Sequence, residues 1–253
     1  GNIYSRCNIV VQDSAIYADQ YAGGLLGYSD AQNYTQNIYQ NVIKNCKIGS
    51  SAYKYPKASE DQSGGYKVKW IEESGSGSKM VGGLCGASYG ANLYNNLVDD
   101  SVEILANEYA GGVIGIGGGA QSYNLEIGAK IKAEGNYAGG YAGRLTGYAE
   151  SPSGPNVLMT PVTKIYRSIF TGTVEGSAGV GGLAGYFEAG NRPKDPQTGV
   201  PIEDSVSGYS ETLNKSNFSQ ILMAQSLIKA GNASQMGLIA QNVIQTADEQ
   251  GID

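Results

Sequence analysis

The stretch Tyr21-Ala22-Gly23-Gly24-Leu25-Leu26-Gly27 is repeated several times along this chain of 253 residues. Further copies begin at Met80, Tyr109 and Tyr137, a shortened copy begins at Val180, and a degenerate copy at Gln235 keeps only the second glycine of the pair. The last position of the motif falls at 27, 86, 115, 143, 185 and 240, so the spacings are 59, 29, 28, 42 and 55 residues. A recurring unit of about 28 residues is typical of a repeat architecture, and the sequence therefore predicts a solenoid.

The glycine pair of each copy predicts a corner in the chain. The flanking residues, such as Ala22 and Leu25, are apolar and three positions apart, although strand residues three apart should face opposite ways. We therefore expect the chain to change direction at the pair, where glycine tolerates a positive φ and a close backbone approach. The apolar residue after each pair should then form one inward column of Leu25, Leu84, Val113, Tyr141 and Leu183. The predicted corner glycines are Gly23, Gly24, Gly82, Gly83, Gly111, Gly112, Gly139, Gly140, Gly181 and Gly182.

A segment of alternating apolar and polar residues precedes each motif, as in residues 42–50 and 123–133. Alternation with period two, broken by Gly, Asp or Asn, favours short strands over helices. Asparagines near the corners, including Asn41, Asn45, Asn95 and Asn96, tolerate left-handed backbone and can form ladders between turns. The fold class that we predict is all-β, a right-handed parallel β-helix of about six or seven turns.

Three long gaps between motifs predict loop insertions at about 51–78, 148–162 and 187–215. Two spacings are close to twice the period, so turns that have lost their glycines are the alternative. The predicted organisation is a solenoid over 1–240 with these insertions, followed by a cap or a linker to a further domain over 241–253. Met236 and its neighbours fit either a last strand turn, which we favour, or a helix.

The first insertion holds the candidate ligand-binding residues, because exposed loops on a rigid stack commonly carry binding. Tyr53, Tyr55, Tyr66 and Trp70 gather there and would suit a glycan or a host or cell-surface protein. The alternative is that this loop folds back and buries the four rings against the solenoid.

Composition excludes several classes of function. The net charge of -6 argues against nucleic acid, and no apolar run approaches the ~18 residues of a membrane span. Because the chain contains no histidine, catalytic arrangements that depend on histidine and His-ligated zinc are impossible.

The remaining reactive side chains are expected to be structural. We expect solvated turn carboxylates at the four adjacent acidic pairs, 72–73, 99–100, 203–204 and 248–249. We expect buried free thiols at Cys7, Cys46 and Cys85. A calcium site at 195–204 lacks a supporting loop pattern, so we predict no catalytic residue, metal or cofactor.

One copy of the repeat resembles a known repeat family. Residues 168–176 read Ser-Ile-Phe-Thr-Gly-Thr-Val-Glu-Gly, residues 180–185 read Val-Gly-Gly-Leu-Ala-Gly, and Asn45-Cys46 lies in an equivalent strand. This unit resembles the GLUG repeat of large secreted or wall-attached bacterial proteins, including the immunoglobulin A protease family of zinc metallopeptidases. The His-Glu-x-x-His signature of that peptidase is absent, so the resemblance implies an extracellular bacterial scaffold and no catalytic residue.

The function expected from the sequence is a non-catalytic extracellular repeat module of a larger bacterial surface or secreted protein, acting as an adhesin stalk, spacer or interaction surface. The alternatives are a carbohydrate-binding or carbohydrate-active module and a non-catalytic region of a host-directed secreted protease. An enzyme should bring three or more carboxylates or Lys/Arg side chains onto one lateral groove across successive turns. A spacer should show scattered charges and an even surface.

Overall fold

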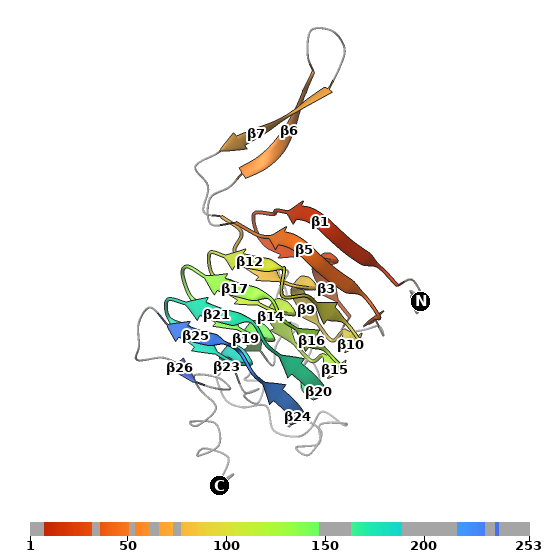
Figure 1. Cartoon of the computed structure of the whole chain (residues 1–253), viewed down its shortest axis with the longest axis vertical. Helices are drawn as coiled ribbons and strands as arrows, with labels where there is room; N and C mark the ends of the chain where they lie inside the picture. The colour runs from red at the N-terminus through yellow and green to blue at the C-terminus, as the bar shows by residue number, and fades with distance from the viewer. Residues whose placement is uncertain are drawn as a thin grey trace, which may run out of the picture.

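The chain folds into a stack of parallel β-sheets (Figure 1). The computed structural model describes residues 8–31, 36–50, 54–60, 66–72, 77–146, 163–188, 217–230 and 236–237. Within them three sheets are parallel throughout, and a separate two-stranded sheet is antiparallel. The predicted all-β parallel β-helix is confirmed.

The strands of one turn pass in order through the three parallel sheets. The long sheet comprises β1 (Val10–Ile16), β4 (Asn37–Tyr39), β5 (Val42–Ile48), β10 (Asn92–Tyr94), β11 (Leu97–Val98), β12 (Glu103–Ala106), β15 (Gln121–Tyr123), β16 (Glu126–Ile127), β17 (Lys130–Ala133), β20 (Lys164–Phe170), β21 (Thr173–Gly176), β24 (Asn217–Met223) and β25 (Leu227–Ala230). The six-stranded sheet comprises β2 (Tyr21–Gly23), β8 (Met80–Gly82), β13 (Tyr109–Gly111), β18 (Tyr137–Gly139), β22 (Gly179–Gly181) and β26 (Met236–Gly237). The five-stranded sheet comprises β3 (Leu26–Asp30), β9 (Cys85–Tyr89), β14 (Ile114–Gly118), β19 (Ala142–Thr146) and β23 (Ala184–Glu188).

The glycine motifs stack directly on one another. Tyr109 is in register with Met80 on one side and Tyr137 on the other, so consecutive motifs occupy consecutive turns. With one strand of the six-stranded sheet per turn, the described residues form six turns. In the predicted inward column, each N–H from Leu25 to Tyr141 donates to the carbonyl of the next member. Four of the five side chains are at most 1% exposed, namely Leu84, Val113, Tyr141 and Leu183. Leu25, in the first turn, packs against the same core, so the predicted column is confirmed.

Of the two predicted reasons for the corner glycines, a close backbone approach is confirmed and a positive φ is wrong. None of the ten lies among the residues with a positive φ. Instead, a Cβ on Gly111 would lie 1.9 Å from the carbonyl oxygen of Ile114, and one on Gly112 would lie 2.1 Å from that of Gly140. Both distances are far below van der Waals contact, so the corner itself leaves no room for a side chain at Gly111, and the next turn leaves none at Gly112.

Left-handed backbone occurs at a different corner of each turn, in the long sheet. Equivalent residues of that sheet have a positive φ in five consecutive turns. Gln40, Asn95 and Asn124 follow β4, β10 and β15, and Arg167 and Gln220 lie within β20 and β24. Beside them Asn41 and Asn96 are buried, and Asn41 donates through its backbone N and Nδ2 to Asn96 Oδ1 at 3.1 and 2.9 Å. The predicted asparagine ladder is confirmed for this pair.

The first insertion contains a β-hairpin of β6 (Lys54–Glu60) and β7 (Tyr66–Glu72), paired antiparallel. Figure 1 shows it extending away from the stack beyond the end formed by β1. Ser50 and Ser78 occupy positions equivalent to the adjacent residues Ala106 and Asn107, so the turn continues directly from one serine to the other. The insertion therefore spans 51–77, and Ser78 belongs to the stack.

The other boundaries fall partly outside the described residues. Residues 148–162, most of 187–215, and 241–253 lie outside them, although β23 extends through Glu188 into the predicted third insertion. In the last turn, β26 pairs Gly237 with Gly181, so Gly237 matches the first glycine of the pair, and its predicted alignment with the second glycine was wrong by one position.

Candidate functional site

Charged side chains form columns on the outer face of the long sheet. Strand alternation buries Ile48, Ile104 and Ile131, so the residue before each lies on the outer face, and these are Lys47, Glu103 and Lys130. Charge alternates along this column, and Lys47 Nζ lies 3.5 Å from Glu103 Oε2 with both side chains more than half exposed. Exposed pairs of this kind stabilise a fold by at most about 1 kcal/mol. Alternating charge therefore mainly disfavours a register in which like charges meet.

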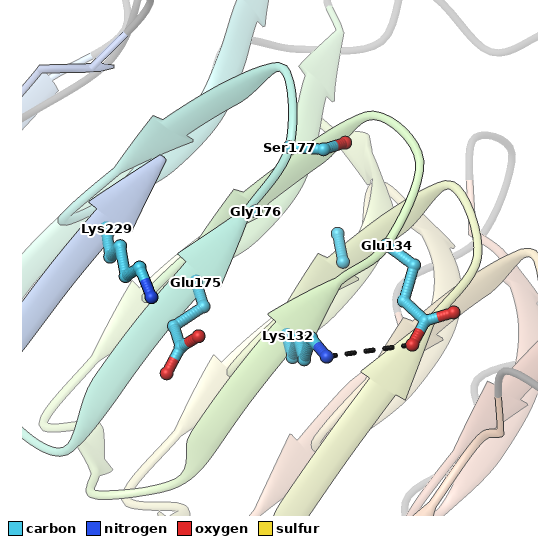
Figure 2. Close-up of a pocket in the computed structure, with 7 residues that line it drawn as sticks. Lys132, Glu134, Glu175, Gly176, Ser177 and Lys229 are labelled. Carbon is cyan, nitrogen blue, oxygen red and sulfur yellow. Dashed lines mark ion pairs between the residues drawn. The ribbon is translucent and has the colours of Figure 1, made fainter. Parts of the chain in front are cut away.

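A groove of about 410 Å³ lies on the same face toward the other end of the stack (Figure 2). Lys132 of β17, Glu175 of β21 and Lys229 of β25 occupy equivalent positions on consecutive turns. Figure 2 shows these three side chains in a row, with Glu134 close to Lys132. Lys132 Nζ lies 3.6 Å from Glu134 Oε1, and their side chains are 54% and 39% exposed. Ser177 completes the polar lining.

The groove suits binding better than acid–base catalysis. Its two ammonium groups and two carboxylates come from three consecutive turns, which is the arrangement expected of an enzyme. However, the Lys132–Glu134 pair is solvated, whereas a general acid is usually tuned by burial in a site that excludes water. The two ammonium groups and two carboxylates give the groove no net charge. It can therefore offer hydrogen bonds and ion pairs to a polar ligand without favouring one sign of charge.

Tyrosines form two further surface columns. Tyr39, Tyr94, Tyr123 and Tyr166 are in register on the long sheet, and the ring centroids of Tyr123 and Tyr166 lie 4.9 Å apart. On the opposite side of the turn, Tyr109 and Tyr137 are stacked at 5.8 Å, and Tyr137 stacks on Tyr186 at 5.0 Å. Partial burial raises the pKa of Tyr94 and of Tyr137 above the ordinary tyrosine value.

The structure brings together only some of the four aromatic residues predicted to bind a ligand. Tyr53 lies outside the described residues. In the hairpin Trp70 is opposite Pro56 and Tyr66 is opposite Glu60, four residues along β7, so Trp70 and Tyr66 belong to one face. Tyr55 is opposite Ile71 and belongs to the other face. The backbone therefore places two of the four predicted residues on a common face of the projecting hairpin.

The described cysteines and the acidic pair Asp99-Asp100 have structural roles in the stack. Cys46 and Cys85 are buried free thiols as predicted, and burial raises the pKa of Cys85 to about 12. Hydrogen bonds from the side chain and the backbone of Ser101 lower the pKa of Asp99, which caps a turn beside the exposed Asp100. In the part of the chain that the structure describes, no three His, Cys, Asp or Glu side chains come close enough to hold a metal ion. The same residues include no helix that is long and apolar enough to cross a membrane.

Neither the groove nor the tyrosine column of the long sheet was predicted from the sequence. The tyrosine column has a sequence signal, because 37–41 reads Asn-Ile-Tyr-Gln-Asn and 92–96 reads Asn-Leu-Tyr-Asn-Asn. The groove has none, since its charged residues are brought together only by the register of the turns. Comparison with protein-family models, with curated proteins and with solved structures found no match to this chain.

Proposed function

We propose that this chain is a non-catalytic repeat module of a larger bacterial surface or secreted protein, and that it works as an interaction surface on the outside of the cell. The observation that carries the proposal is the repetition of polar and aromatic side chains in register on the outer face of the long sheet. The resemblance of residues 168–185 to the GLUG repeat supports the extracellular bacterial setting.

The dimensions of the stack favour an interaction surface over a spacer. Six turns at 4.7–4.9 Å per turn give a height of only about 25–30 Å. A single unit of about 28 residues in an extended polyproline conformation would span roughly 85 Å. The stack therefore gains little height per residue but exposes a broad side surface. Such a shape suits binding to a partner better than it suits spanning a distance.

A screen of the chain against immobilised glycans and host or bacterial cell-surface proteins tests the proposal. The variant Lys132→Glu/Lys229→Glu reverses the cations of the groove, and Lys44→Glu/Lys47→Glu makes the same change of net charge elsewhere on the long sheet. We expect the intact chain to bind at least one class of partner without altering it. The absence of binding to every class would contradict the proposal.

A carbohydrate-active module is the second candidate, favoured by the four charged side chains of the groove. Release of new reducing ends from a polysaccharide, abolished by Glu134→Gln or Glu175→Gln and retained in Glu103→Gln, would establish this candidate and overturn the non-catalytic proposal.

A further inference from the structure

A strip of tyrosines runs along the stack on the long sheet, away from the charged groove. It consists of Tyr39, Tyr94, Tyr123 and Tyr166, one from each of four consecutive turns. The preceding residue in three of these turns is a buried aliphatic residue, Ile38, Leu93 or Ile165, and in the fourth it is the buried Ser122, so the tyrosines face outward. Tyr123 is 37% exposed and the other three are half-buried.

The rings overlap without covering one another. The centroids of Tyr94 and Tyr123 are 5.8 Å apart with an angle of 38° between the ring planes, and those of Tyr123 and Tyr166 are 4.9 Å apart at 37°. Since Tyr123 is exposed and the other three tyrosines are half-buried, part of each side chain remains open to solvent. The result is a ridged aromatic surface with one ring per turn.

Two columns of amide side chains border the tyrosines. On one side, two residues before each tyrosine, Asn92 Nδ2 donates to Asn37 Oδ1 at 3.0 Å, and Gln121 and Lys164 continue the column. On the other side the left-handed residues are exposed, and Asn124 Nδ2 donates to Asn95 Oδ1 at 2.9 Å. These amides hold one another in place and keep further donors and acceptors for a ligand.

The charge of this strip is unlike that of the groove. The bordering columns contain no carboxylate, and their only cations are Lys164 and Arg167, both in the turn of β20. Arg167 Nε already donates to Gln220 Oε1 at 3.0 Å. Phenol and amide groups without a dominant charge fit a ligand that carries many hydroxyl groups and apolar ring faces. The side-chain pattern repeats every 4.7–4.9 Å, which is close to the length of one sugar ring in an extended chain.

We infer that the strip formed by the tyrosine column and its two amide columns binds a linear, uncharged polysaccharide lying along the stack, with one sugar per turn. The inference rests on the proposed function and names the ligand class for it. Aromatic rings supply apolar contact with the sugar faces, and the bordering amides supply hydrogen bonds to the hydroxyl groups. Several weak contacts in register would then add up along one chain.

Affinity electrophoresis and pull-down with cellulose, xylan, mannan and a soluble mixed-linkage β-glucan test the inference, with polygalacturonate as the acidic counterpart. The variant Tyr94→Ala/Tyr123→Ala removes the centre of the strip. Its matched control, Tyr109→Ala/Tyr137→Ala, removes a stacked tyrosine pair from the other side of the turn. Because loss of stacked rings can weaken the fold, a third variant, Asn95→Gly/Asn124→Gly, removes two amides while glycine retains the left-handed backbone.

We expect the intact chain to bind at least one uncharged polysaccharide, with little dependence on salt. The strip variants should weaken binding about tenfold or more, and the control pair should not. The inference would be overturned if both tyrosine variants lost binding equally while the amide variant bound as well as the intact chain. The rings would then affect binding only by stabilising the fold. Preference for polygalacturonate, or binding to cell-surface proteins alone, would also overturn it, but would leave the proposed interaction module standing. Only the absence of any partner would defeat both.

Discussion

Replacing Gly112 by alanine should loosen the stack at its centre. The new Cβ would lie 2.1 Å from the carbonyl oxygen of Gly140 and 2.5 Å from Ile127 Cγ2. Relief of this overlap requires a local separation of about 1 Å between two turns. That movement breaks the hydrogen bonds from Gly112 N to Gly139 O and from Val113 N to Tyr141 O, which are 3.1 and 2.9 Å long.

The expected loss of stability follows from these contacts. Two backbone hydrogen bonds contribute about 0.5–1.5 kcal/mol each, and overpacking costs about 1–3 kcal/mol. Reduced entropy of the unfolded chain returns only about 0.4–1 kcal/mol, so the net cost is about 3 kcal/mol. For a chain of this size we expect Tm to fall by about 6–12 °C.

Thermal unfolding followed by circular dichroism measures this change. The matched control is Gly27→Ala, at the exposed last position of the first copy of the motif, where the nearest atom to a new Cβ is Tyr21 O at 3.0 Å. We expect a loss of less than about 1 kcal/mol there. Equal Tm values for Gly112→Ala and the intact chain would show that close approach between turns is not what requires these glycines.

Three further predictions concern other parts of the molecule. Asn96→Ala should cost about 2–4 kcal/mol in urea unfolding, because the backbone N–H of Asn41 and the carbonyl of Ile38 lose their buried partner, whereas the outward Asn92→Ala should cost about 0.5 kcal/mol. Deleting 51–77 and joining Ser50 to Ser78 should preserve the β-rich spectrum, since the N–H of Ser78 already donates to Ser50 O at 2.7 Å; an unfolded product would show that the hairpin supports the stack. The raised pKa of Cys85 means that its stabilising effect is complete below the unfolded-state pKa near 9 and is lost as pH rises toward 12, so Tm should fall over this window more steeply in the intact chain than in Cys85→Ala.

The fold was predictable because the repeat constrains it at every turn. Glycine pairs with apolar neighbours predicted the corners, and alternation of apolar and polar residues predicted the strands. Together they predicted the inward column from Leu84 to Leu183. Both a close backbone approach and a positive φ were expected at the glycines, and only the close approach is present, because either requirement selects the same residue in a sequence. Left-handed backbone was expected at asparagines near the corners. It is found at Asn45 and Asn95 but not at Asn41 or Asn96, and its presence at Arg167 was visible only in the structure.

The surface was much harder to predict than the core. The groove joins Lys132, Glu175 and Lys229, and only the register between turns brings these residues together. The long gap between motifs predicted that ligand binding would lie in the first insertion, where Tyr66 and Trp70 share a face of the hairpin. The tyrosine strip lies inside the repeat itself, and the similarity of 37–41 to 92–96 was the only signal for it.

Hydroxyl-radical footprinting of the intact chain tests the central claim most directly, because it reads individual tyrosine side chains with and without bound polysaccharide. We expect the strongest binder among the uncharged polysaccharides to protect Tyr94, Tyr123 and Tyr166 from oxidation and to leave Tyr109 and Tyr137 unchanged. Equal protection of both columns, or protection confined to Trp70 and Tyr66 of the hairpin, would contradict it.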